Sequence, residues 1–248
     1  GPGGMSSTPA VEQDQIGLLE AAGVPVAVVD FFVDPFRDTE ASLTILGGLL
    51  GREAQAAALA AFRRERLDAV ARRLAGVTTR PLMMLHVHAG AMPCCASPGR
   101  GTFDAMIRAA GGTNLGAELL PGAFGQISPE ALLSHDPAVY VGTGGSFAGQ
   151  GLSLGAGVTE VQARASLDRL LQEPALSALS AVRNGRAHAI WHGFNDTPAH
   201  FVMVEALARW LHPGHRADLD PGSSLDALNT RFAAVPMEGA YWVDPGSG

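Results

Sequence analysis

The chain has 248 residues and a net charge of −7, and 47% of its residues are hydrophobic while 17% are charged. A chain with this much apolar surface to bury is not intrinsically disordered, and no run approaches the roughly 18 consecutive apolar residues of a membrane-spanning helix. All 17 basic residues are arginine. The clusters Arg63–Arg66 and Arg72–Arg73 have the spacing of one solvated helix face, so no nucleic-acid partner is expected.

The chain opens with a segment that does not resemble folded structure. Residues 1–14 are expected to be a tag remnant and an N-terminal segment, because Gly1–Gly4 resembles a protease-cleavage scar and no export signal follows it. A helix is predicted over 15–22. The apolar run Val26–Val29 after it is typical of a buried parallel strand.

Two further helices are predicted before the chain changes character. The first spans 39–50, with Thr39 as its N-cap and Gly51 at its end. The second is long, rich in alanine and arginine, and spans 53–74 with an apolar stripe along one face. This part of the sequence therefore contains one strand–helix unit and a long helix.

After residue 80, strands alternate with helices. Strands are predicted over 82–87, 139–141 and 187–191. Helices are predicted over 102–110, from Ser128 and Pro129 onward, and over 161–171, 174–182, 198–211 and about 224–232, with an extended end at 241–243. This alternation indicates an α/β fold with a largely parallel sheet.

Six short motifs, in order along the chain, carry a resemblance to a known family. They are Ala22–Val26 leading to Asp30, Leu46–Glu53, Ala110–Gly116, Ile127–Leu133, Asp136–Val141 and Ala181–Arg186. Together they resemble the bacterial periplasmic substrate-binding proteins of ABC importers for iron–siderophore, haem or vitamin B12, of the helical-backbone type (class III).

The resemblance implies two parallel-sheet lobes, with ligand held in the cleft between them. A partial N-terminal lobe would span 15–52, a linking backbone helix 53–76, and a C-terminal α/β lobe 77–248. The expected function is to bind an iron–siderophore in the periplasm and deliver it to the permease, without a resident cofactor. The family's strand–helix units before Ala22 are missing, so that either the sequence is truncated or the natural N-lobe is reduced, and a homodimer or an exposed apolar edge is then favoured.

Ligands of open α/β sheets bind beyond the carboxyl ends of the strands. This rule selects the loops 30–38, 88–101, 142–157 and 191–200. The stretch Gly142–Gly145 lacks the lysine of a phosphate loop, so it is interpreted as a flexible cleft loop.

The second of these loops has an unusual composition. His86 and His88 share one face of a strand. Together with Met92, Cys94 and Cys95 they predict, as one reading, a nitrogen–sulfur site for copper(I), zinc or haem iron. A second reading has one buried histidine and cysteines that only pack. A third is a vicinal disulfide that stiffens the loop, since adjacent cysteines can pair only with each other or stay free.

The remaining ligand candidates come from three loops. Arg100, just before a helix, could bind an anionic oxygen of a ferric chelate. Asp30, Phe31 and Phe32 would face the residues of the loop 191–200 across the cleft. The other candidates, from the cysteine-containing loop and the loop 191–200, are Cys94, Cys95, Ser97, His192, Phe194, Asn195 and His200.

Two acidic residues are candidates for docking on the permease, because the family uses one acid per lobe there. Glu12 and Glu160 hold the corresponding places. Catalysis is not expected, since the chain has no G-x-S-x-G nucleophile and no paired carboxylates. The alternative function is a haem or soft-metal carrier using the His86–Cys95 region; haem ligation by Tyr140 or Tyr241 is disfavoured by their positions in a strand and in the tail.

Overall fold

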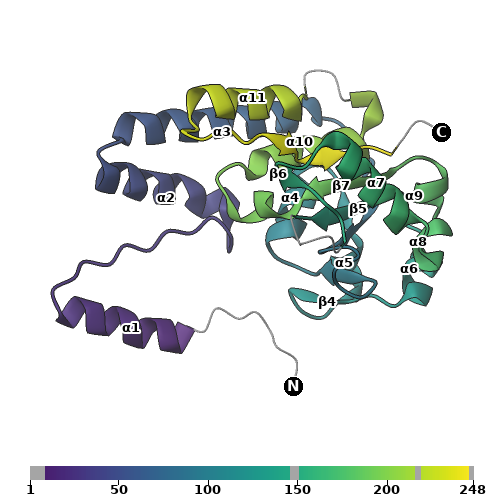
Figure 1. The fold of residues 1–248 in the computed structure, drawn as a ribbon, viewed down its shortest axis with the longest axis horizontal. Helices are drawn as coiled ribbons and strands as arrows, with labels where there is room; N and C mark the ends of the chain where they lie inside the picture. Colours follow the sequence, from purple (N-terminus) through teal and green to yellow (C-terminus); the bar gives the residue numbers. More distant parts are fainter. Residues whose placement is uncertain (1–8, 146–150, 216–218, 246–248) are drawn as a thin grey trace.

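The computed structural model describes residues 9–145, 151–215 and 219–245, and side chains from residue 15 onward (Figure 1). Its centre is a five-stranded sheet in the order β3-β1-β5-β7-β9. The strands are β1 (Leu82–His86), β3 (Thr113–Asn114), β5 (Val139–Gly144), β7 (Ala187–Trp191) and β9 (Trp242–Val243). The first four in chain order are parallel, and β9 pairs antiparallel with β7. The α/β class with a mainly parallel sheet is confirmed.

Alternate residues of the strands face two different cores. Met83, Leu85 and Val141 contact one core, while Met84 and Tyr140 contact the other. This follows from the two-residue period of a strand, and it explains why these strands are apolar throughout. Both faces of the sheet are therefore covered by helices.

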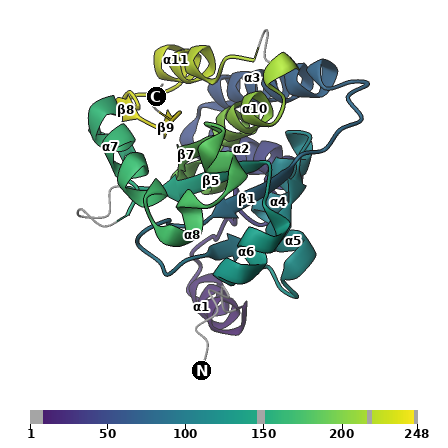
Figure 2. The same ribbon diagram turned by 90° about the vertical axis from the view of Figure 1, so that its right-hand side faces the viewer.

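Figure 2 shows the two helical layers. On one face lie α3 (Glu53–Arg73), α4 (Thr102–Ala109), α10 (His200–Leu211) and α11 (Pro221–Arg231). On the other lie α5 (Leu115–Leu119), α6 (Pro129–His135), α7 (Glu160–Leu171), α8 (Pro174–Ser177) and α9 (Ser180–Arg183). The predicted cap of α6 is confirmed, since Ser128 Oγ accepts a hydrogen bond from Ala131 N–H and Pro129 follows it. The helix predicted over 174–182 is divided into α8 and α9.

Smaller elements complete the lobe. The strand β2 (Ala96–Pro98) pairs antiparallel with β4 (Phe124–Gln126), and β6 (Gly155–Ala156) pairs with β8 (Gly239–Ala240). Two 3-10 helices, η1 (His192–Asp196) and η2 (Pro213–His215), flank α10. None of the helices in the described ranges is long and apolar enough to cross a membrane.

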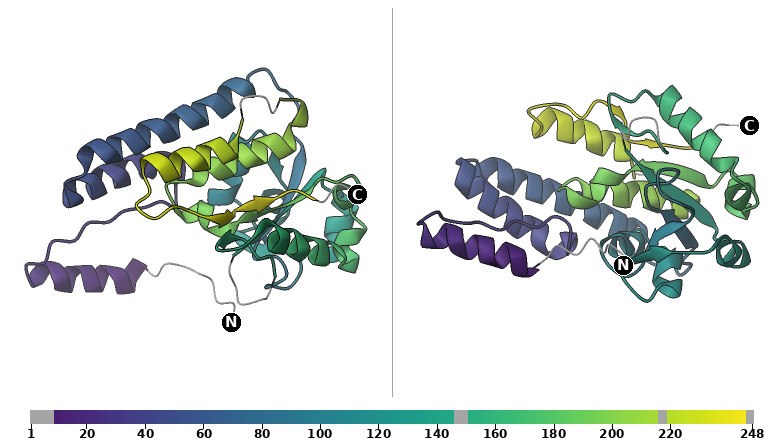
Figure 3. Two further views of the ribbon diagram at one scale, coloured as in Figure 1. Left: turned by 45° about the horizontal axis from the view of Figure 1, so that its top comes forward. Right: turned by 60° about the horizontal axis from the view of Figure 1, so that its bottom comes forward.

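The N-terminal part is helical. It contains α1 (Pro9–Ala21) and α2 (Pro35–Leu50), and α2 packs beside α3 as a helical hairpin (Figure 3). Helix α2 begins four residues earlier than predicted. Its cap is Asp34, and Thr39 is buried inside it, while Gly51 ends it in a left-handed conformation as predicted.

The strand predicted over 26–29 is wrong. Residues 24–30 have no regular structure and Val28 is 69% exposed. A strand must pair its backbone N–H and C=O groups with a neighbour, and an isolated apolar run has none to pair with. The parallel sheet of the described chain therefore lies wholly after residue 80, and Figure 1 shows α1 apart from it at the end of an extended segment.

Candidate ligand-binding site

Three neighbouring strands bring polar side chains together at their carboxyl ends. Thr143 lies near the end of β5, the middle strand, while His88 follows β1 and His192 follows β7. The Oγ1 atom of Thr143 accepts a hydrogen bond from His88 N–H at 3.0 Å and lies 2.9 Å from Nδ1 of His192. The two imidazole rings lie against each other with centroids 3.8 Å apart and their planes tilted by 32°. We call these three residues the histidine–threonine cluster.

Both imidazoles of the cluster are neutral at neutral pH. Burial, and to a smaller extent the neighbouring His88, lowers the pKa of His192 to about 3. Burial also lowers the pKa of His88. A neutral imidazole offers a nitrogen lone pair to a metal or a hydrogen-bond donor. Nε2 of His192 has no hydrogen bond within the described part of the chain, while Nδ1 is held by Thr143.

Aromatic residues flank the cluster. The ring of Phe103, in the first turn of α4, lies 5.4 Å from that of His192. The preceding Thr102 donates a hydrogen bond from its hydroxyl to the carbonyl of Phe32. This contact brings the N-terminal segment to the sheet lobe near the cluster, where Phe32 is 49% exposed.

The side chain of Asp30 is engaged by the backbone of its own turn. The carboxylate of Asp30 accepts hydrogen bonds from the N–H groups of Phe32 and Val33, at 2.8 and 2.9 Å. Its side chain therefore shapes the turn that leads into α2. Phe31 is half-buried.

The cysteine-containing loop does not form the metal site that its composition suggests. Cys94 and Cys95 are joined in a disulfide, as in the third reading, so neither is a free thiol. His86 is buried with Nδ1 2.8 Å from the hydroxyl of Tyr140, and burial lowers the pKa of His86 to about 4. Met92 is half-buried in the same loop. Across the described residues no group of three or more histidine, cysteine or acidic side chains could hold a metal ion.

The loop 191–200 contributes less to the cleft than predicted. Phe194 is fully buried against Trp191 and Tyr241, and Asn195 is buried with Nδ2 donating to the carbonyl of His192. His200 is fully buried where Nε of Arg63 donates to its Nε2 at 3.0 Å. The 3-10 turn of η1 directs Phe194 and Asn195 inward, so of the four predicted residues only His192 reaches the site.

Two other candidates, Ser97 and Arg100, differ in burial. Ser97 is completely buried in β2, where it packs against the backbone at Gly116, so its hydroxyl does not reach the cleft. Arg100 is exposed immediately before α4. Its guanidinium is therefore free to meet an anionic ligand at this edge of the sheet.

The sequence reasoning missed Thr143 and Phe103. The stretch that begins at Gly142 is not a flexible loop at its start, because β5 continues through Gly144 and is buried throughout. Extending the apolar run Val139–Val141 through Gly144 would have placed Thr143 at the carboxyl end of a strand, at the same edge of the sheet as His88 and His192. The rest of that loop, residues 146–150, lies outside the described residues.

Comparison with known proteins identifies the family. The sequence profile of the periplasmic binding protein family matches residues 6–190. The chain belongs to the periplasmic binding protein family. No curated protein sequence matches it.

Solved structures of periplasmic binding proteins share the fold. The FepB protein of Veillonella parvula, described as TroA-like, has a TM-score of 0.86 at 22% identity over 94% of this chain and 70% of that one. A haem-binding protein of Pseudomonas aeruginosa has a TM-score of 0.64 at 24% identity over 98% and 75%. The molybdate-binding MolA of Haemophilus influenzae has a TM-score of 0.65 at 14% identity over 94% and 72%. At these levels of sequence identity the comparisons show a shared fold only.

The two docking candidates of this periplasmic binding protein are on separate elements. Glu160 is the first residue of α7, exposed and paired with Arg164 at 2.6 Å, beside a groove of about 590 Å³ between α7 and the β8–β9 tail. Glu12 falls within α1 rather than before the first helix, and its side chain lies outside those described.

Proposed function

We propose that this periplasmic binding protein is the solute-binding component of an ABC importer and that its ligand is an anionic ferric chelate of the siderophore class. The ligand would lie over the histidine–threonine cluster, at the carboxyl ends of β1, β5 and β7. Family membership supports the carrier role, and the position follows the rule for ligand sites in open α/β sheets.

One observation carries the choice of this site. Three polar side chains from adjacent strand ends meet there, and Nε2 of His192 is unengaged by the described residues. Exposed Arg100 and half-exposed Phe32 border the same edge of the lobe. A cationic and an aromatic group suit a ligand that has anionic oxygens and flat rings.

A second candidate ligand is haem. The neutral imidazole of His192 is a suitable axial ligand for haem iron, and Thr143 would hold its Nδ1 in the required orientation. Similar structures include haem-binding proteins of Pseudomonas aeruginosa and of Roseiflexus, the latter with a TM-score of 0.59.

Titration with two probes tests both candidates. Ferric tris-catecholate and haemin are added separately to the protein, and binding is followed by tryptophan fluorescence and visible absorbance. We expect saturable binding of the catecholate, and His192→Ala to weaken it at least tenfold, whereas the exposed His135→Ala serves as a matched control without effect. A Soret band that His192→Ala removes would decide for haem, and the absence of binding by either probe would contradict the proposed ligand class.

A further inference from the structure

The disulfide belongs to a loop that also carries a residue of the candidate site. Residues 88–95, which we call the cysteine loop, connect β1 to β2. Val87 N–H donates to the carbonyl of Ala96 at 2.8 Å, which closes the loop at its base. His88 is thus the first residue on one side of that base and Cys95 the last on the other. The hydrogen bond that closes the loop joins the residues that precede His88 and follow Cys95.

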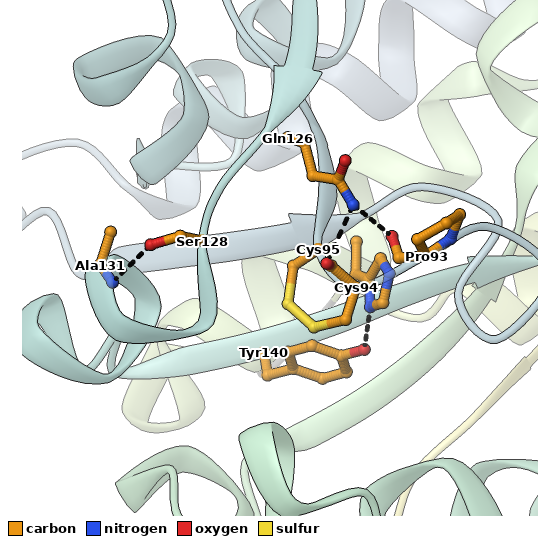
Figure 4. Close-up of a disulfide and its surroundings, with 8 residues drawn as sticks. Pro93, Cys94, Cys95, Gln126, Ser128, Ala131 and Tyr140 are labelled. Atoms are coloured by element: carbon orange, nitrogen blue, oxygen red, sulfur yellow. Dashed lines mark hydrogen bonds between the residues drawn. A yellow bond between two sulfur atoms is a disulfide. The ribbon is translucent and has the colours of Figure 1, made fainter.

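Each side of the cysteine loop is fixed to a different element. On the cysteine side, Gln126 Nε2 donates to the carbonyls of Pro93 and Cys94 at 3.3 and 3.0 Å, and Cys95 exchanges two backbone hydrogen bonds with Ile127 (Figure 4). On the other side, Thr143 Oγ1 accepts from His88 N–H. The disulfide is part of the first attachment, and the second holds His88 at the other end of the same loop.

His88 has a backbone conformation that depends on its surroundings. Its φ is 46°, in the left-handed region that residues other than glycine rarely adopt. The carbonyl of His88 accepts hydrogen bonds from the N–H groups of Ala91 and Met92, both at 2.9 Å. Such a conformation persists only while neighbouring contacts maintain it. A change in the flexibility of the cysteine loop would therefore alter the position of the His88 ring.

The two cysteines differ in burial. Cys95 is completely buried in the core that includes Tyr140, and Figure 4 shows the disulfide ring beside the phenol of that tyrosine. Cys94 is only partly buried at the edge of the same core. An external thiolate can therefore approach the sulfur of Cys94, and Cys95 would be the leaving group.

We infer that Cys94–Cys95 is a thiol–disulfide exchange site whose redox state controls ligand binding at the histidine–threonine cluster. A dithiol reductant attacks Sγ of Cys94 through one thiolate, forms a mixed disulfide and releases Cys95 as a thiolate that takes up a proton. The reductant's second thiol then displaces Cys94. The protein gains two electrons and two protons as two thiols, and the reductant leaves as its own disulfide.

Reduction removes the covalent link that restricts the backbone between Pro93 and β2. The cysteine loop then has more conformations available, and the His88 ring spends less time against that of His192. The oxidised protein is therefore the high-affinity form, and the reduced protein binds ligand about tenfold more weakly. This effect on ligand binding rests on the proposed function.

The experiment compares oxidised and reduced protein with a probe that does not itself change redox state. The protein is reduced with dithiothreitol and desalted without air, and gallium(III) tris-catecholate is titrated by tryptophan fluorescence. Alkylation followed by mass spectrometry counts the thiols, and amide hydrogen exchange reports on residues 88–95. We expect two thiols, faster exchange in the cysteine loop, about tenfold weaker binding, and recovery after reoxidation.

Two variants separate the redox effect from side effects of reduction. Cys94→Ser/Cys95→Ser and Cys94→Ala/Cys95→Ala both lack the disulfide, and each is expected to bind like the reduced protein and to be unaffected by dithiothreitol. Two thiols with unchanged affinity and unchanged exchange would overturn the inference, as would resistance to excess dithiothreitol. If the oxidised protein binds neither the gallium probe nor haemin, the proposed function fails. Amide hydrogen exchange of residues 88–95 then decides alone whether reduction loosens the cysteine loop.

Discussion

Apolar residues of the sheet lobe and of the N-terminal part of this protein can differ strongly in burial. In β1 and β5 the residues Met83, Leu85 and Val141 are completely buried. In the N-terminal part, Val28 and Val33 are each 69% exposed, and Leu50 at the end of α2 is also 69% exposed. The strands of the lobe have parallel neighbours and helices on both faces, whereas the run 24–33 has neither among the described residues.

The difference teaches that an apolar run specifies a strand only where partners exist. Hydrophobic residues supply the driving force for burial, but the backbone of a strand must also be paired. Where no neighbouring strand pairs with it, the run stays extended and leaves its side chains in water. An exposed apolar surface of this kind is characteristic of an interaction site.

Replacing one leucine by alanine in each region tests this comparison with the largest expected effect. Leu85→Ala, in the centre of the sheet, is expected to lower the free energy of unfolding by about 2–5 kcal/mol, because it leaves a cavity in a close-packed core. Leu49→Ala, at a position that is 66% exposed, is expected to change it by less than about 0.5 kcal/mol. Urea unfolding followed by circular dichroism measures both. Equal losses would show that α2 is packed as firmly as the sheet.

The junction between the two regions should be the next most sensitive place. Arg63 of α3 is 3% exposed, donates from Nε to His200 of α10, and donates from Nη2 to the carbonyl of Pro35 at 2.8 Å. Arg63→Ala leaves both acceptors without their donor, and we expect a loss of roughly 2–3 kcal/mol in urea unfolding. The neighbouring Arg64→Ala removes only an exposed ion pair with Glu40 and is the matched control.

Sequence reasoning was reliable for the sheet lobe and weaker for side-chain placement. The strands at 82, 139 and 187 were predictable because each is a short apolar run between helical segments, and α6 because Ser128 and Pro129 mark its start. The strand over 26–29 was not, since a local pattern does not show whether a partner strand is present.

Placement of the site residues depended on tertiary contacts. His192 was predictable from its place at a strand end. Phe194 and His200 were not, because the direction of a side chain in a 3-10 turn or at a helix start is set by packing rather than by spacing. The pairing of Cys94 with Cys95 was one of three open readings, since adjacency alone permits both free and paired cysteines.

A third test asks whether both regions contribute to ligand binding. Arg100→Ala, in the sheet lobe, is expected to weaken binding of ferric tris-catecholate by about 1.5–3 kcal/mol, the usual value for a hydrogen bond to a charged group. Arg37→Ala, in the N-terminal part, removes an exposed arginine already paired with Asp38 and is expected to have no effect. Fluorescence titration of both variants measures the affinities. An equal effect of the two substitutions would indicate a long-range electrostatic effect of losing a positive charge instead of a contact at Arg100.

The last test concerns a pH dependence of stability that originates in the sheet lobe. Burial, with a smaller effect of Arg63, lowers the pKa of His200 to about 3, and burial lowers that of His86 to about 4. An unfolded histidine titrates near 6.5, so between roughly pH 3 and 6.5 the unfolded chain binds more protons than the folded one. The contribution of these neutral histidines is therefore complete above about pH 6.5 and is lost as the pH falls below it. Each fully shifted histidine accounts for at most about 1.4 kcal/mol per pH unit. Urea unfolding between pH 4.5 and 7.5 should show this slope. His200→Gln keeps an acceptor for Arg63 and should make the slope shallower. The exposed His135→Gln is the control and should leave the slope as in the wild type. A slope that His200→Gln does not change would mean that the acid sensitivity originates outside the junction.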